Sequence, residues 1–201
     1  DVSAREWSIT ADFFRTEFIN QVIIDRERDP FVVYFYNLNG QSWSNSFQLE
    51  SKYELFRNFD LTLAFRYNDV KTTIDGDLVQ KPLVNKYKGL ISMSYLTRMK
   101  KWQFDANVQF NGDQRLPYTG FNPAEYQLTS HSPMYVIINA QITRFFKNWE
   151  LYLGTENLTN YTQTNPIIAA EDPFGKYFDS SVIWGPVSGI KIYAGVRYVI
   201  K

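Results

Sequence analysis

The chain has 201 residues, with 21 basic and 21 acidic side chains, one histidine and no cysteine. The balanced charge argues against a nucleic-acid binder, which normally carries a basic excess, so we expect no nucleic acid among its partners. Without cysteine the chain forms neither a disulfide framework nor a thiolate site. Its 16 Phe, 14 Tyr and 5 Trp exceed ordinary globular usage, and such rings favour interfaces between apolar and wet surroundings. Composition alone leaves two classes open, an aromatic-rich β-sandwich and a membrane β-barrel.

No segment qualifies as a transmembrane helix. The longest uncharged run, residues 31–49, is interrupted by asparagine, glycine, glutamine and serine, so it would be a poor span. The chain starts at Asp1, with neither an initiator methionine nor a signal peptide, which we interpret as a processed or partial polypeptide.

Eight segments alternate apolar and polar residues with a period of two, which is the period of a strand and not of a helix. In chain order, these segments are residues 7–13, 47–53, 61–67, 87–95, 102–110, 136–143, 149–156 and 190–200. The pattern is clearest in residues 102–110, where every even position is apolar and every odd position is polar. Strands of about nine to eleven residues are long enough to cross a bilayer at a tilt.

The connections between these segments alternate in length. The short ones lie near residues 56–59, 98–101 and 147–148, and the long ones cover residues 17–45, 75–82, 111–133 and 158–188. Transmembrane barrels have short turns on one side and long loops on the other, whereas a sandwich has no reason to sort its loops in this way. We therefore predict an all-β, antiparallel, up-and-down transmembrane β-barrel in a single domain.

The first long connection carries a pattern of its own. Alternation continues in residues 18–24 and 31–36, and the six residues between them, 25–30, are charged and turn-like. This pattern predicts a hairpin that extends beyond the membrane, with its charged tip in water.

Several motifs resemble a known family. Residues 154–161, Gly-Thr-Glu-Asn-Leu-Thr-Asn-Tyr, resemble a signature near the end of TonB-dependent outer-membrane receptors. Residues 178–189 and 193–198 resemble the last loop and last strand of the Bacteroidetes-type members, and residues 14–22 and 37–40 are similar to that group as well.

The resemblance implies a 22-stranded barrel with a plug domain in its lumen, of which residues 1–201 would be the C-terminal segment of about eight strands. It implies a bacterial outer-membrane location and active uptake of a scarce ligand, which could be a siderophore, a metal complex, a cofactor, an oligosaccharide or a peptide. The TonB complex would act through a plug that lies upstream. Outer-membrane lipid, the barrel-assembly machinery and a surface lipoprotein are the other partners that it implies.

The end of the chain resembles the C-terminal signal that the barrel-assembly machinery reads. The residues that match are Tyr193, Gly195, Tyr198 and Ile200. The usual signal ends on Phe or Trp, so the ending Ile200-Lys201 departs from it. The alternative interpretation is an ordinary amphipathic strand.

No catalytic or metal-binding motif is present, and we expect neither an enzyme nor a cofactor. His131 is the only histidine, which excludes histidine clusters, and its position in a predicted loop argues against a histidine-based triad. Glu171, Asp172 and Asp179 do not follow the spacing of a calcium-binding loop. Any ligand contacts are expected in the outer loops, at Arg115, Tyr118, Tyr177 and Trp184.

Three functions remain open from the sequence: a fragment of an active transporter, a stand-alone eight-stranded barrel with a structural or adhesive role, and a secreted soluble β-domain. The two barrel hypotheses differ in one hydrogen-bond ladder. Closure of a small barrel requires residues 5–15 to pair with residues 190–200, whereas a receptor fragment leaves both strands at open edges. The bulky polar face, which includes Arg66 and Arg197, favours the larger barrel.

Overall fold

The computed structural model describes residues 7–29 and 32–200. Its strands are β1 (Trp7–Glu17), β2 (Val22–Asp25), β3 (Tyr34–Asn37), β4 (Ser42–Phe56), β5 (Phe59–Ile74), β6 (Asp77–Gln80), β7 (Tyr87–Leu96), β8 (Trp102–Asn111), β9 (Tyr135–Phe145), β10 (Trp149–Glu156) and β11 (Lys191–Tyr198). The one helix of the described residues is a short 3-10 turn, Ala124–Tyr126. None of the helical structure in residues 7–29 and 32–200 is long and apolar enough to span a membrane.

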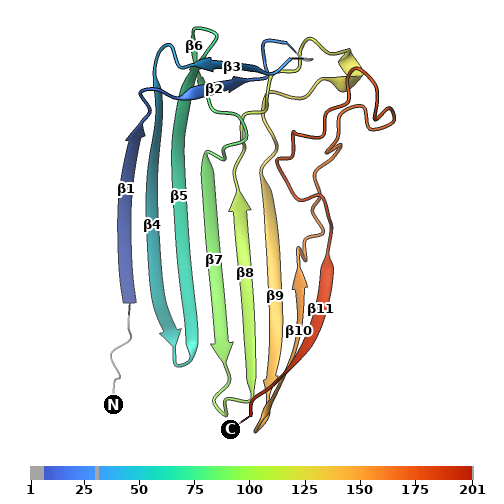
Figure 1. Ribbon diagram of the computed structural model, residues 1–201. Coiled ribbons are helices and arrows are strands. Elements are labelled where there is room, and N and C mark those ends of the chain that lie inside the picture. The colour runs from blue at the N-terminus through green and yellow to red at the C-terminus, as the bar shows by residue number, and fades with distance from the viewer. Residues whose placement is uncertain (1–6, 30–31, 201) are drawn as a thin grey trace.

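The eight predicted strands are confirmed as β1, β4, β5 and β7 to β11. They form one antiparallel sheet in the order β1-β4-β5-β7-β8-β9-β10-β11, so each long strand pairs with the next long strand along the chain. Figure 1 shows them as a single curved wall, with the short turns at the lower end and the long connections at the upper end. This arrangement is the up-and-down meander that the alternating loop lengths predict.

Two strands are longer than the sequence pattern indicates. β4 has 15 residues and β5 has 16, and β6 pairs with the end of β5 inside a segment predicted to be a loop. Asp75 and Gly76, with φ of 49° and 88°, make the tight turn that starts this extra hairpin. The prediction missed the extension because residues 68–74 lack apolar alternation. These residues lie beyond the apolar band of the sheet, where no lipid is present and alternation is not required.

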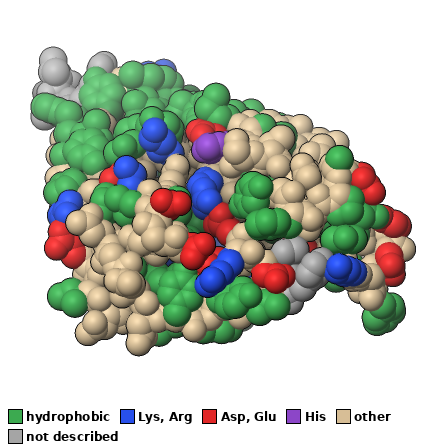
Figure 2. All heavy atoms as spheres, turned by 90° about the horizontal axis from the view of Figure 1, so that it is seen from above, with side chains coloured by type: hydrophobic (Ala, Val, Ile, Leu, Met, Phe, Trp, Pro, Cys, Tyr) green, Lys and Arg blue, Asp and Glu red, His purple; other side chains and the backbone are tan. Residues whose placement is uncertain are grey.

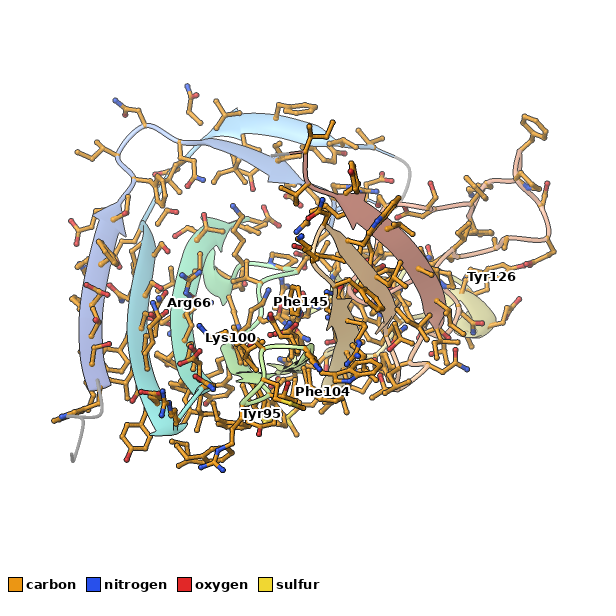
Figure 3. The ribbon with its side chains drawn as sticks, turned by 90° about the horizontal axis from the view of Figure 1, so that it is seen from below. Arg66, Tyr95, Lys100, Phe104, Tyr126 and Phe145 are labelled. Carbon is orange, nitrogen blue, oxygen red and sulfur yellow. The ribbon has the colours of Figure 1, made fainter. Side chains whose placement is uncertain are left out.

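The two faces of the sheet differ in chemistry. In Figure 3 the sheet is seen along its strands as an open arc, with Arg66 on the concave side and Tyr95 and Phe104 on the convex side. The convex face is apolar and exposed, for example at Ile9 (58 %) and Leu153 (54 %). Leaving such side chains in water instead of burying them costs about 1.5–3 kcal/mol each, so this face is stable only against lipid.

The concave face is polar, and its side chains bind one another across strands. Arg66 Nε donates to Gln48 Oε1 at 3.1 Å. Ser94 Oγ donates to Asp105 at 2.6 Å, and Arg197 Nη1 donates to Glu150 at 2.8 Å. Such a surface suits a hydrated lumen.

Aromatic rings mark both boundaries of the convex apolar band. At the turn end, Phe56 stacks on Phe59 with ring centroids 4.8 Å apart, and Trp149 lies 4.5 Å from Tyr198. At the loop end, Tyr87 lies 5.5 Å from Tyr67. Phe59 and Tyr67 are eight positions apart on β5, which corresponds to about 26 Å along the strand and matches the apolar band of an outer-membrane barrel.

The sheet is open. β1 and β11 lie at opposite ends of the strand order, and no ladder joins them within the part of the chain that the structure describes. The predicted absence of a ladder is thereby confirmed, and the chain does not close into a small eight-stranded barrel. In hydrocarbon, each edge would leave a row of backbone groups unsatisfied at several kcal/mol each.

Candidate ligand-binding site

Among the described residues, the most buried apolar side chains lie in the long connections and not in the large sheet. They are Ile23, Leu116, Ile168, Ala169 and Val182, with 4–7 % of their surface exposed. A sheet of one layer has nothing packed on either face, whereas the connections fold onto one another. They form a compact loop layer over one end of the wall (Figure 1).

The predicted hairpin is confirmed as β2 and β3, which pair from Val22 with Asn37 to Asp25 with Tyr34. Residue 30 of its predicted tip and residue 31 of its predicted second strand lie outside the described residues. The prediction that its charged tip lies in water is wrong for Asp25, which is buried, and for Glu27, which packs against Arg115 of another loop. Asp25 is 1 % exposed, and its carboxylate accepts hydrogen bonds from the backbone N–H of Glu27 at 2.9 Å and from Tyr36 Oη at 3.2 Å. These bonds stabilise the turn of the hairpin. Burial raises the pKa of the Tyr36 hydroxyl.

The hairpin tip is joined to the loop between β8 and β9 by an ion pair between Glu27 and Arg115. Arg115 donates to both carboxylate oxygens, with Nη1 at 2.8 Å from Oε1, and also donates to the Gln80 carbonyl at 3.3 Å. The two side chains are 12 % and 21 % exposed. Forked binding of a carboxylate by a largely buried arginine is among the stronger polar contacts in proteins.

A second contact joins the hairpin to the loop between β10 and β11. Arg26 Nη2 lies 3.1 Å from Asp179 Oδ2, and Arg26 Nη1 also contacts Ser181 Oγ. The hairpin therefore spans from the β1–β4 side of the wall to the opposite loops. Seen from above, acidic and basic side chains are interspersed across this layer (Figure 2).

These contacts enclose a cleft of about 150 Å³ in the loop layer. Both Tyr118 and Tyr177 line it, together with Arg26, Lys176 and Phe178. The backbone N–H of Tyr118 donates to Glu27 Oε2 at 3.3 Å, so the ion pair also fixes one wall of the cleft. Three of the four predicted contact residues, Arg115, Tyr118 and Tyr177, thus lie in one region.

Trp184, the fourth predicted residue, lies at a larger pocket of about 560 Å³ beneath the last loop, on the concave wall. Its backbone is held on both sides: the carbonyl accepts from Gln114 Nε2 at 2.8 Å, and the N–H donates to Gln163 Oε1 at 2.8 Å. Tyr135 Oη donates to the same carbonyl at 3.2 Å. The Tyr135 ring stacks in parallel on the Tyr161 ring, with centroids 4.9 Å apart. Burial raises the pKa of Tyr161.

The polar side chains of this pocket are not among the predicted contact residues. They come from the upper ends of β8 to β11 and include Gln109, Asn111, Asn139, Glu156 and Lys191. Gln109, Asn111 and Asn139 are amides at positions that continue the polar face of the predicted strands. This alternation was the sequence signal that could have identified them. The pocket offers amide donors and acceptors, one charge of each sign and a nearby aromatic stack, which suit a polar ligand.

The signature at residues 154–161 shapes the last loop. Asn157, 7 % exposed, has φ of 52° and donates to the carbonyls of Tyr161 at 2.7 Å and Ser188 at 3.1 Å. Its side-chain oxygen accepts from the Tyr161 N–H at 3.1 Å. The motif therefore closes one turn and ties it to the segment that leads into β11.

The residues expected to form the assembly signal are packed in the wall. Tyr193 donates to Gln141 Oε1 at 3.1 Å, and Tyr198 packs on Trp149. Ile200 is 86 % exposed. This packing is compatible with either interpretation of the terminal strand.

The described residues contain no group of three or more His, Cys, Asp or Glu side chains that could hold a metal ion. His131 is exposed in the loop between β8 and β9, with Nδ1 at 3.2 Å from Ser130 Oγ.

A single curved antiparallel wall, apolar outside and polar inside, with its loops gathered at one end, is the architecture of a segment of a large outer-membrane barrel. The chain belongs to the TonB-dependent receptor-like β-barrel family, whose pattern matches residues 1–158. Its strands are therefore those of a β-barrel of the bacterial outer membrane. A comparison with curated proteins found no match.

Solved receptors show the same fold. The siderophore receptor PiuA from Acinetobacter baumannii is 19 % identical with a TM-score of 0.61, over 96 % of this chain and 26 % of that one. The ferric citrate transporter FecA is 15 % identical with a TM-score of 0.67, and the match covers 95 % of this chain and 29 % of FecA. The copper transporter OprC is 12 % identical with a TM-score of 0.65, and the match covers 96 % of this chain and 28 % of OprC. The chain thus spans little more than a quarter of these receptors.

Proposed function

We propose that residues 1–201 form the C-terminal segment of a 22-stranded receptor that takes up a scarce ligand across the outer membrane with TonB-derived energy. The open edges of β1 and β11 support this proposal, because each needs a neighbouring strand in hydrocarbon. The remaining strands and a plug domain would complete the barrel and its lumen. Lipid, the barrel-assembly machinery and a surface lipoprotein are the further proposed partners.

The arrangement of the loops is the observation that carries the proposed role in ligand uptake. The hairpin of the loop layer crosses over the concave side of the wall and is fixed to two other loops through Glu27–Arg115 and Arg26–Asp179. The aromatic cleft lies in this layer, and the amide-lined pocket lies below it on the wall. A ligand that arrives from outside would meet the cleft first and the pocket second.

The similar receptors suggest the class of ligand. PiuA is a siderophore receptor, FecA transports ferric citrate and OprC transports copper. We infer that the ligand is a metal complex. Tyr118 and Tyr177 would contact its organic part, Arg115 would keep the cleft open by holding Glu27, and Trp184 would line the second site.

The test is uptake by cells that lack their own iron and copper receptors and produce the full-length protein. Ferric citrate, a ferric catecholate siderophore and cupric ion serve as radiolabelled probes. We expect accumulation of at least one probe, and its loss in cells without TonB. Accumulation that persists without TonB, or of none of the three, would contradict the proposal.

A matched pair of variants tests the cleft. Tyr177→Ala removes a ring that lines it and should weaken binding of the transported probe about tenfold, as loss of an aromatic contact commonly does. Phe174→Ala removes a ring of the same loop that is fully exposed, at 101 %. That variant should bind as the unchanged receptor does.

A further inference from the structure

Two tyrosine–glycine pairs face each other on the concave side of β10 and β11. Tyr193 lies directly opposite Gly154, and Tyr152 lies directly opposite Gly195. A Cβ at Gly154 would stand 2.3 Å from Tyr193 Cζ, and a Cβ at Gly195 would stand 2.2 Å from Tyr152 Cζ. Each ring therefore lies across the glycine of the opposite strand, in the space that any other residue would fill.

In the first pair, the tyrosine ring reaches past the glycine to a third strand. The register places Gly154 opposite Gln141 on β9, so Tyr193, Gly154 and Gln141 stand in one line across three strands. After crossing Gly154, the Tyr193 hydroxyl donates to Gln141 Oε1 at 3.1 Å. Neighbouring strands are about 4.8 Å apart, so one ring spans one strand and meets a long polar side chain from the second.

The second pair repeats this geometry in the opposite direction. Tyr152 is on β10 and its ring crosses Gly195 on β11, with Cζ and Oη both 2.2 Å from the added Cβ. Its hydroxyl is thus carried to the free edge of the sheet, because β11 is the last strand in the order. Among the described residues, no strand pairs with that edge.

We propose that Tyr152 reaches across Gly195 to a side-chain acceptor, Gln, Glu, Asn or Asp, on the strand that pairs with the free edge of β11. That strand runs antiparallel to β11 and belongs to the remainder of the receptor barrel, so this inference rests on the proposed function. The acceptor stands opposite Gly195, as Gln141 stands opposite Gly154. A shift of one residue would turn the acceptor to the lipid side, so the bond fixes the register of the seam.

The test uses the full-length receptor in outer membranes, with the photo-cross-linker p-benzoylphenylalanine placed at position 152 or at position 193. The variant at 193 is the matched control, and its cross-links should map to β9 near Gln141. The variant at 152 should cross-link to one peptide outside residues 1–201, centred on an Asn, Asp, Gln or Glu.

The alternative results have separate meanings. Cross-links from position 152 to β8 or β9, or to several unrelated lumenal peptides, would overturn the inference and leave the receptor proposal intact. Cross-links to β1 would overturn the receptor proposal itself, because they would join the two edges of this chain.

As a second measurement, Tyr152→Phe keeps the ring over Gly195 and removes only the hydroxyl. It should lower the unfolding temperature of the receptor in detergent by about one degree, the shift that loss of one hydrogen bond causes in a chain of several hundred residues. Tyr193→Phe should cause the same shift, and an unchanged temperature in Tyr152→Phe alone would overturn the hydrogen bond.

Discussion

Tyr152 and Gly195 stand directly opposite each other on β10 and β11, and the tyrosine ring occupies the position that a side chain at 195 would take. Glycine leaves a gap in a strand because it has no side chain to pack, and an aromatic ring from the neighbouring strand can cover that gap. Gly195 was expected from its place in a terminal assembly signal. Its neighbour on β10 supplies a packing reason for the same residue.

Gly195→Ala should destabilise the receptor, because the new methyl group displaces the Tyr152 ring. Overpacking of this kind costs about 1–3 kcal/mol. Urea unfolding in detergent measures the change. Gly89→Ala is the control, since its Cβ would meet Phe110 at an ordinary 3.4 Å, and it should have little effect. In a Tyr152→Ala background Gly195→Ala should cost nothing further, and an equal cost there would contradict the contact.

Glu27→Gln should loosen the hairpin from the loop layer, because it leaves the guanidinium of Arg115 without its carboxylate. Breaking a largely buried pair costs on the order of 3 kcal/mol locally. Hydrogen exchange of residues 22–28 should therefore accelerate. Glu17→Gln breaks the Arg15–Glu17 pair, whose side chains are 49 % and 65 % exposed, and should change little. Unchanged exchange in Glu27→Gln would show that the pair does not hold the hairpin.

Trp102 and Trp149 should contact lipid, because both project from the apolar convex face near the turns, where they are 41 % and 50 % exposed. Trp184 lines the concave pocket and should not contact lipid. Brominated lipids should quench single-tryptophan receptors at positions 102 and 149. Stronger quenching of Trp184 than of either would reverse the assignment of the two faces.

Tyr198→Ala should reduce the amount of assembled receptor in the outer membrane, if the terminal strand is read by the assembly machinery. Immunoblots of folded and unfolded receptor in isolated membranes measure the yield. The structure adds a control, because Tyr198 packs on Trp149. Trp149→Ala removes the same contact and leaves the terminal pattern intact, so it should assemble better than Tyr198→Ala. Equal yields would indicate a packing role alone.

The contact between Tyr126 and Glu171 should depend on pH. The tyrosine hydrogen bond lowers the pKa of Glu171, and the same bond raises the pKa of Tyr126. The contact is therefore complete at neutral pH, is lost as pH falls through the lowered pKa of Glu171, and is lost again as pH rises through the raised pKa of Tyr126. The protection factors of amides 124–127, which correct for the intrinsic pH dependence of hydrogen exchange, should be highest between these limits. Tyr126→Phe should remove the dependence, and its persistence there would assign the effect to another group.

The long strands could be predicted because side-chain parity is a local property. Residues 102–110 show the apolar convex face and polar concave face of β8 in their own order, and the alternating loop lengths place all long loops at one end. The open sheet followed from the size of the polar face at Arg66 and Arg197. Cross-strand register was not visible, because it depends on which residue of a distant strand stands opposite.

Tertiary structure alone decided how the loops meet. Glu27 binds Arg115 across 88 positions of sequence, and Arg26 reaches Asp179 across 153. Nothing in the local pattern selects these partners among 21 acidic and 21 basic side chains. The same holds for Tyr152 over Gly195, since a one-residue shift between β10 and β11 would separate them. The sequence by itself therefore determined the wall, its two faces and its family, whereas long-range packing decided the cleft, the pocket and the contact between Tyr152 and Gly195.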